Sequence, residues 1–257
     1  MGYNVFVVGL DEVNVGHLEA IRNAEDYHFH ELLPLSSVQG AERYPIEEWL
    51  AEADHRLESF DGSVDAIIDF WDFPISLMVP ILIQRHGTTG PSLEVVANCE
   101  HKYWSRLSQR YAIPEAVPAF NKLNPYDVTS VSAVGLDYPF WLKPVKSFAS
   151  QLGFRVDGDR ELERALAAIR QGIPRFAEPF NHVLEQVQLP PEVRGVDGRW
   201  CVAEEIMTGS QHTVAGYAHR GEVHIYGVID SVNYPDSPSF FRYHYPSTRL
   251  DGRVQER

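Results

Sequence analysis

The chain has only two cysteines among its 257 residues, Cys99 and Cys201. Two cysteines so far apart exclude a disulfide framework and a cage of several thiolates around a metal ion, and free thiols suit a reducing compartment. No apolar run approaches the length of a membrane span. Residues 1–9 follow a strand pattern without a basic segment, which is not typical of a signal peptide. We therefore expect a cytoplasmic protein with no membrane partner.

Lysine is scarce as well. The chain has four lysines against eighteen arginines, and its formal net charge is −14 at pH 7. This charge repels nucleic acid and anionic membranes, which excludes both as expected partners. The length and the 44% hydrophobic content indicate a globular protein of one or two domains. Any anionic ligand must therefore be held by local groups, and two of the lysines, Lys143 and Lys146, lie in one short segment.

That segment reads as an apolar strand followed by a loop of small residues. Residues 138–145, Tyr-Pro-Phe-Trp-Leu-Lys-Pro-Val, place Lys143 among apolar side chains, and residues 147–153, Ser-Phe-Ala-Ser-Gln-Leu-Gly, form the loop. A buried ammonium loses its hydration at a large cost unless it reaches a carboxylate or phosphate. The backbone N–H groups of such a loop can converge on the same anion. The alternative is a hairpin whose lysine extends into solvent.

The first third of the chain alternates strand and helix patterns. This βαβ series favours a parallel sheet. The turn after the first strand, residues 9–14, lacks the Gly-x-Gly-x-x-Gly fingerprint, so we expect no dinucleotide site there. We expect strands at residues 3–8, 27–33 and 64–70, and helices at 15–24, 46–53 and 74–85.

The remainder changes from helical to antiparallel patterns. Closely spaced prolines give residues 113–120 an extended character, and residues 171–199 are the least regular part. Residues 213–219 and 222–230 flank an Arg-Gly turn and predict an antiparallel hairpin. Helices are expected at residues 100–111 and 160–170, and residues 249–257 look helical with no closing strand.

Five motifs in this order resemble the ATP-grasp superfamily, of the carboxylate–amine ligase or biotin carboxylase-like type. They are residues 65–72 (Asp-Ala-Ile-Ile-Asp-Phe-Trp-Asp), 87–92 (Gly-Thr-Thr-Gly-Pro-Ser), 98–106 followed by Tyr-Ala-Ile-Pro at 111–114, Trp-Leu-Lys-Pro at 141–144, and Val-Ala-Glu-Glu-Ile-Met-Thr-Gly at 202–209. The resemblance implies an α/β protein in two parts. Residues 1–95 would form a Rossmann-like domain with a parallel sheet. Residues 96–257 would form a two-lobed α+β nucleotide fold, with a linker helix, a lysine-strand lobe at about 135–198, and a hinge and antiparallel lobe at about 199–257.

The resemblance also implies an activity: ATP activates a carboxylate as an acyl phosphate, which an amine then attacks. The expected ligands are ATP or ADP and small-molecule carboxylate and amine substrates. In the hinge, the C=O of Glu205 and the N–H of Met207 would pair with adenine. Gln211 stands where the family usually has a ribose-binding Glu, and an amide can still accept that hydrogen bond. The nucleotide-binding residues implied are Lys102, Lys143, Lys146, Ser147, Ser150, Glu204, Glu205, Met207 and Gln211.

The end of the chain departs from the family pattern. The family holds Mg²⁺ with acidic and Asn residues on late strands, but Asp236, Asp251 and Glu256 lie in loop-like surroundings. We therefore expect a C-terminally incomplete fold without metal ligands, which binds nucleotide better than it turns it over. The alternatives are a non-catalytic or degenerate adenine-nucleotide-binding module and a fragment of a longer enzyme. No catalytic residue is assigned, and a homodimer is possible.

Three further groups are weaker candidates. Asp69 and Asp72 follow a parallel strand, where they could face the acceptor substrate or cap the next helix. Arg242 and His244 could contact substrate or lie exposed in a loop. The pair of histidines at 28 and 30 shares one strand face and could be half of a metal site or a surface pair.

Overall fold

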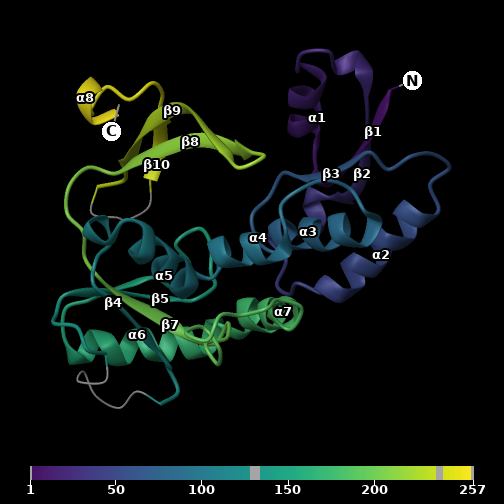
Figure 1. The fold of residues 1–257 in the computed structure, drawn as a ribbon. Coiled ribbons are helices and arrows are strands. Elements are labelled where there is room, and N and C mark those ends of the chain that lie inside the picture. Colours follow the sequence, from purple (N-terminus) through teal and green to yellow (C-terminus); the bar gives the residue numbers. More distant parts are fainter. Residues whose placement is uncertain (1, 128–133, 236–239, 256–257) are drawn as a thin grey trace. The chain divides into compact units, whose positions relative to one another are not determined.

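The chain forms two compact units, Met1–Glu205 and Ile206–Arg257. The computed structural model describes residues 2–127, 134–235 and 240–255 (Figure 1). Within these ranges no helix combines the length and the apolar character needed to cross a bilayer.

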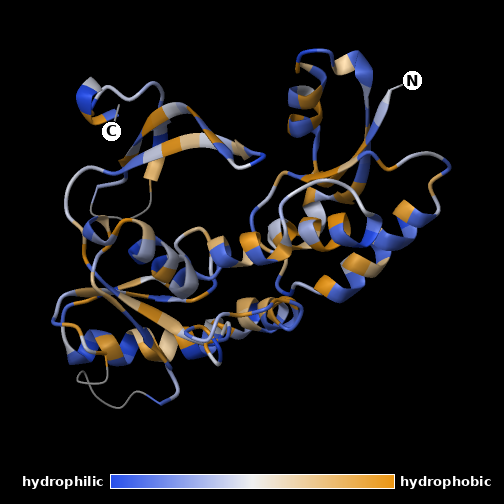
Figure 2. Cartoon of the chain, in the orientation of Figure 1, coloured by the Kyte–Doolittle hydropathy of each residue, from blue (hydrophilic) through white to orange (hydrophobic). Residues whose placement is uncertain are grey.

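The first unit begins with the predicted parallel sheet. Its strand order is β2-β1-β3, and both pairings are parallel. One face packs in a core with α2 and α3, and the other face packs a small cluster under α1. Figure 2 shows the apolar stripe of α2 alternating with its polar face. The elements of this part are β1 (Tyr3–Leu10), α1 (Glu12–Glu19), β2 (Tyr27–Pro34), α2 (Ile46–Glu58), β3 (Ala66–Asp69) and α3 (Ile75–His86), with short 3₁₀ turns at Ala24–Asp26 and Leu35–Ser37.

The first helix differs from its prediction. We expected residues 15–24, whereas α1 is Glu12–Glu19. The side chain of Asp11 accepts a hydrogen bond from the N–H of Asn14, which starts the helix earlier than the apolar spacing suggested. The helix then ends at Glu19, with Ala20 as its C-cap.

A second, antiparallel sheet follows in the order β4-β7-β5-β6. Its apolar face packs on α6, as Leu142 and Ala203 join Leu166 in one core. Its other face is turned to α5, and Figure 1 shows the two helices on opposite sides of the sheet. The elements are α4 (Leu93–Glu100), α5 (Lys102–Ala112), β4 (Phe120–Leu123), β5 (Phe140–Pro144), β6 (Phe154–Val156), α6 (Asp159–Gly172), α7 (Pro174–Leu184) and β7 (Cys201–Glu205), with a 3₁₀ turn at Pro114–Ala116.

Two helices of this part were missed in the sequence. α4 precedes α5 and is separated from it by His101 alone, where we expected one helix over 100–111. α7 lies in the stretch expected to be irregular, because its two prolines obscured the helical pattern. Pro174 is tolerated at the helix start, and Phe176, Phe180 and Val183 form a buried stripe. These apolar contacts compensate for Pro179 inside the helix.

The second unit is a three-stranded antiparallel sheet in the order β10-β9-β8. Its β8–β9 pairing confirms the predicted hairpin. The expectation that Arg242 and His244 lie in a loop was wrong, because both lie on β10, which pairs with β9. A strand of five exposed residues shows no alternation of apolar and polar residues to reveal it. The elements are β8 (His212–His219), β9 (Glu222–Asn233), β10 (Phe240–His244) and a short helix α8 (Gly252–Gln255).

Candidate functional site

The predicted strand lysine lies on the polar face of the second sheet. On neighbouring antiparallel strands Lys143 is opposite Val202 and Trp141 is opposite Glu204, so all four side chains share one face. The expectation of a lysine buried in an apolar strand was wrong, because the strand alternates: Lys143 keeps 20% of its side-chain surface exposed. Leu142, between them, points into the opposite, apolar core.

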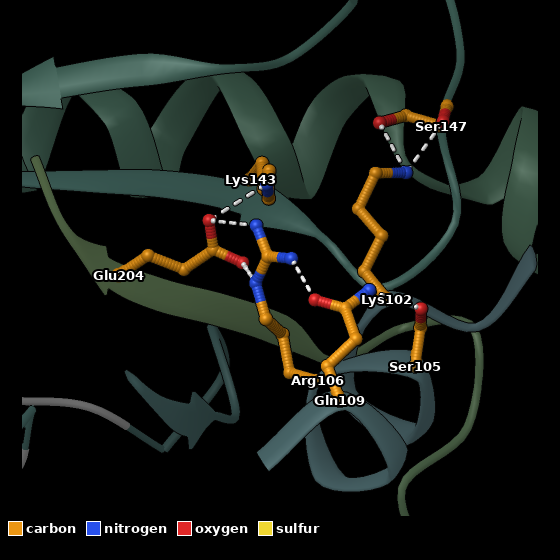
Figure 3. A network of polar contacts seen from close by, with 7 residues as sticks. All are labelled: Lys102, Ser105, Arg106, Gln109, Lys143, Ser147 and Glu204. Atoms are coloured by element: carbon orange, nitrogen blue, oxygen red, sulfur yellow. Dashed lines mark hydrogen bonds and ion pairs between the residues drawn. The ribbon is translucent and has the colours of Figure 1, made fainter. Parts of the chain in front are cut away.

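The carboxylate of Glu204 is the anion that Lys143 reaches (Figure 3). Lys143 Nζ donates to Glu204 Oε2 at 2.8 Å. Arg106 donates from Nε to Oε1 at 2.9 Å and from Nη2 to Oε2 at 3.2 Å, which forms a two-point fork. Glu204 is only 7% exposed. Its burial opposes ionisation, but Lys143 and Arg106 outweigh that effect and hold its pKa below the usual range.

Arg106 was missed as a site residue. It lies on α5, one helical turn after Lys102, so both side chains emerge from the same face of the helix. That spacing was visible in the sequence and could have identified it. Gln109 accepts a hydrogen bond from Arg106 Nη1 at 2.6 Å and donates to Ser105 at 3.0 Å, which fixes the guanidinium plane.

Lys102 is held at the first position of α5. The N–H of Lys102 donates to the C=O of Val145 at 3.1 Å. The preceding His101 is buried, accepts from the N–H of Trp104 at Nδ1 and lies 2.9 Å from the C=O of Val196 at Nε2. Since Nδ1 accepts, the proton of the neutral ring is on Nε2. The backbone at the start of α5 is therefore rigidly placed beside β5.

The amine of Lys102 reaches the loop that follows β5. Its Nζ donates to the C=O of Ser147 at 2.5 Å and lies 3.5 Å from the hydroxyl of the same residue. Burial and then the charge of Lys143 lower the pKa of Lys102 to about 8, although Asp72 and Glu204 act in the other direction. Lys102 is therefore a desolvated cation that, within the described part of the chain, donates to neutral oxygens of Ser147.

Lys146 faces carboxylates instead. Its side chain is 2% exposed, its Nζ contacts the carboxylate of Glu100 and it lies 3.6 Å from Asp72 Oδ1. The ring of Phe73 is 4.7 Å away. Burial, the largest influence, lowers the pKa of Lys146 to about 8, and Asp72 opposes that shift. Lys146 therefore links the end of β3 and the end of α4 to the segment after β5.

The loop at residues 147–153 is compact and strained. Ala149, Ser150 and Leu152 adopt left-handed backbone conformations, with φ of 50°, 58° and 57°. Non-glycine residues occupy this region at a cost, so surrounding contacts must hold the loop in place. Ser147 is buried and Ser150 is exposed. The ring of Phe148 packs edge-on against Phe176 at 5.6 Å and anchors the loop to α7.

The predicted hinge contains the division between the two units, which falls between Glu205 and Ile206. The N–H of Glu205 donates to the C=O of Ala119 at 2.8 Å, and Met207 is exposed. Gln211 lies just before β8, where its Oε1 accepts from Asn233 at 3.3 Å.

The weaker candidates are scattered. Burial raises the pKa of Asp69 to about 6. Asp72 is half exposed and accepts from the N–H of Phe73 at 2.6 Å. The ring of His30 stacks on Phe6 and its Nε2 lies 2.9 Å from the side-chain oxygen of Asn4.

Of the three late acidic residues, the structure describes Asp251. Asp236 and Glu256 lie outside the described residues, and Asp251 accepts from the N–H of Arg253 at 2.8 Å at the start of α8. Across the ranges that the structure describes, no three His, Cys, Asp or Glu side chains are close enough to hold one metal ion.

No family model and no curated protein matches the sequence. Solved structures do. An L-amino acid ligase from Bacillus licheniformis matches with a TM-score of 0.64 at 16% identity, over 99% of this chain and 57% of its own. A carboxyaminoimidazole ribonucleotide synthase from Aspergillus clavatus matches at 0.66 and 13%, over 99% and 60%. A D-alanine–D-alanine ligase from Bacillus anthracis matches at 0.60 and 14%, over 100% and 75%.

These proteins are ATP-grasp ligases. The chain has an ATP-grasp fold. This finding confirms the resemblance drawn from the motifs, at the level of the fold, with its parallel sheet followed by antiparallel sheets. The chain spans 57% of the length of the B. licheniformis ATP-grasp ligase and 60% of the A. clavatus one.

Proposed function

We propose that the chain binds the phosphates of an adenine nucleotide with Lys102 and Lys143, and serves an ATP-dependent ligase that joins a carboxylate to an amine. One observation carries the proposal. Within an ATP-grasp fold, two lysines converge on the polar face of an antiparallel sheet beside a compact loop of small residues (Figure 3). The fold neighbours include synthases in complex with ATP and with ADP, which supports the choice of ligand.

The network around Glu204 suits this task. An entering phosphate competes with Glu204 for Lys143, and the fork from Arg106 keeps the carboxylate neutralised when Lys143 turns away. Phosphate binding therefore exchanges one anionic partner of Lys143 for another, while Glu204 stays paired with Arg106. Lys102 donates to uncharged oxygens of Ser147. When phosphate binds, Lys102 therefore gains a charged partner without giving one up.

The proposed reaction begins when the substrate carboxylate attacks the γ-phosphorus of ATP. The bond to the β–γ bridging oxygen breaks, and ADP and an acyl phosphate form. The amine then attacks the carbonyl carbon, inorganic phosphate leaves, and the ammonium proton passes to a base. Lys102 and Lys143 offset the negative charge of the transferring phosphate.

Magnesium does not fit the described residues. The family resemblance implies Mg²⁺, yet among the described side chains no group of three suitable ligands comes together. We assign no step of the reaction to a metal on these residues. The carboxylates near the lysines are already engaged: Asp72 and Glu100 with Lys146, and Glu204 with Lys143 and Arg106.

Thermal shift with ATP and with ADP tests the binding. Ligand that binds the native state raises the melting temperature. We expect a rise in the wild type, a much smaller rise in Lys143→Ala, and a nearly full rise in Lys122→Ala. Lys122 is the matched control because it lies on the same sheet face but its Nζ lies over the rings of Tyr103 and Trp200. Equal losses in both variants would contradict the lysine assignment, and no rise in the wild type would contradict nucleotide binding.

A further inference from the structure

The second unit contains a serine, a histidine and an aspartate in a row. Ser210 Oγ lies 2.6 Å from His212 Nε2. His212 Nδ1 lies 2.9 Å from Asp230 Oδ1. Ser210 is exposed just before β8, His212 is the first residue of β8, and Asp230 is directly opposite His212 on β9. A nucleophile, a base and a group that orients the base stand in this order in enzymes that transfer acyl groups.

Asp230 is fixed and ionised. It is 1% exposed, and it accepts from the hydroxyl of Ser247 at 2.5 Å and from the N–H of Thr248 at 2.9 Å. Burial opposes its ionisation, but these hydrogen bonds outweigh that effect and lower the pKa of Asp230 to about 2. Its second histidine neighbour, His244, is more distant, at 3.9 Å. The position of the carboxylate is thus set by the segment after β10, independently of His212.

The two contacts of His212 specify its tautomer. An ionised carboxylate only accepts hydrogen bonds, so the proton of a neutral ring belongs on Nδ1, which faces Asp230. Nε2 is then an acceptor, and the hydroxyl of Ser210 is its donor. The Nδ1–H is not well aligned with the carboxylate in this structure. Hydrogen bonds of this kind are often poorly aligned in free enzymes and tighten with substrate.

We propose that Ser210 is a nucleophile toward esters with a short apolar acyl group, with His212 as its base and Asp230 as a positioning residue. The preference for an apolar acyl group follows from the side chains that share the face of β8 with His212. Val214 follows His212 on the same face, lies opposite Val228 and is largely exposed. An acyl chain attached at Ser210 could cover this valine pair. This proposal does not depend on whether the chain binds a nucleotide.

The proposed reaction needs only these three side chains, an ester and water. Ser210 Oγ bonds to the carbonyl carbon while its proton passes to His212 Nε2. The bond to the leaving alcohol breaks, and the alcohol takes that proton from the imidazolium. Water then attacks the acyl-serine with the same base, releases the carboxylic acid and restores the serine hydroxyl.

A fluorophosphonate probe on the full chain tests the nucleophile, because it modifies a serine only when a base activates it. We expect labelling of Ser210, located by peptide mass spectrometry, and release of nitrophenol from p-nitrophenyl butyrate. Ser210→Ala should remove both signals. His212→Asn should slow labelling about 100-fold, since general base catalysis contributes at least that much. Thr208→Ala, which removes a hydroxyl from the same loop, should behave as the wild type.

Circular dichroism and melting temperature verify that each variant is folded. Asp230→Asn also removes an acceptor of Ser247 and Thr248 and could unfold the unit, so His212→Asn is the deciding variant. No label at Ser210 in the folded wild type would overturn the proposal. Equal labelling rates in folded His212→Asn and wild type would overturn it as well, because the serine would then react without its base.

Discussion

Lys143 and Glu204 form an ion pair of 2.8 Å from diagonal positions on neighbouring antiparallel strands, β5 and β7. The pair lies on the polar face of the sheet, whereas the residues between them face the core under α6. Both residues were expected among the nucleotide-binding residues, with Lys143 at the phosphates. In the structure, the carboxylate of Glu204 instead binds the ammonium of Lys143.

Glu204→Gln should change stability and nucleotide affinity in opposite directions. Removing the carboxylate leaves the charges of Lys143 and Arg106 without their partner, so the free energy of unfolding should fall by about 2–3 kcal/mol. Lys143 no longer has to leave an anion, so ATP should bind more tightly in the folded variant, by about 3–10-fold. Urea unfolding and isothermal titration calorimetry measure the two effects.

The neighbouring Glu205→Gln is the matched control, because Glu205 is exposed and outside the ion network. It should leave both quantities within about 0.5 kcal/mol of the wild type. The lowered pKa of Glu204 adds a pH test. Its stabilising effect is present above the usual glutamate pKa, about 4.3, and is lost as pH falls through the lower folded-state pKa. Glu204→Gln should therefore flatten the loss of wild-type stability in acid; an unchanged acid profile would contradict the ion pair.

A second prediction concerns the buried pair of Lys146 and Glu100. Lys146→Met should lower the free energy of unfolding by about 3 kcal/mol, because Glu100 loses its charged partner. The double variant Lys146→Met/Glu100→Gln should regain at least half of that loss. Its amide is neutral and can still accept from the hydroxyl of Ser76, which lies 2.8 Å from Glu100. Chemical denaturation of the four-member cycle gives the coupling, with Lys122→Met as a comparison at a half-buried lysine. Additive losses would contradict the coupling.

The third prediction follows from the pKa of Lys102, about 8. If protonated Lys102 binds phosphate, nucleotide affinity should be steady below pH 7 and about tenfold weaker at pH 9 than at pH 7, as the amine loses its proton. Lys102→Arg stays charged throughout this range and should give a flat profile, whatever its absolute affinity. Titration calorimetry across pH measures this. A similar decline in the arginine variant would assign the titration to another group.

The sequence was most informative where the pattern was long and regular. The parallel sheet of the first unit and the β8–β9 hairpin follow from apolar runs separated by turns, and both are found. α7 was missed because Pro174 and Pro179 mask a helix that tertiary burial of Phe180 maintains. β10 was missed because none of its side chains is buried.

The site was only partly foreseeable. The position of Lys143 in a strand indicated that it needs an anion, but not that Glu204, 61 positions later, supplies it. The pairing of β5 with β7 creates that contact, and its register cannot be read from the local pattern of either strand. Lys146 posed the same problem, since its partners Glu100 and Asp72 come from other elements of the first unit.

The last prediction concerns Gln211, which stands where a ribose-binding glutamate is expected. Gln211→Glu introduces a stronger acceptor for the ribose hydroxyls. This contact alone should tighten ATP binding about 3–5-fold. The added negative charge also repels the phosphates and hides part of the gain. Comparing ATP with 2′,3′-dideoxy-ATP cancels this repulsion, because both nucleotides carry the same phosphates. The affinity ratio of the two nucleotides, measured by calorimetry, should rise in the variant. An unchanged ratio would place the ribose away from Gln211, and its contact with Asn233 would then serve only the start of β8.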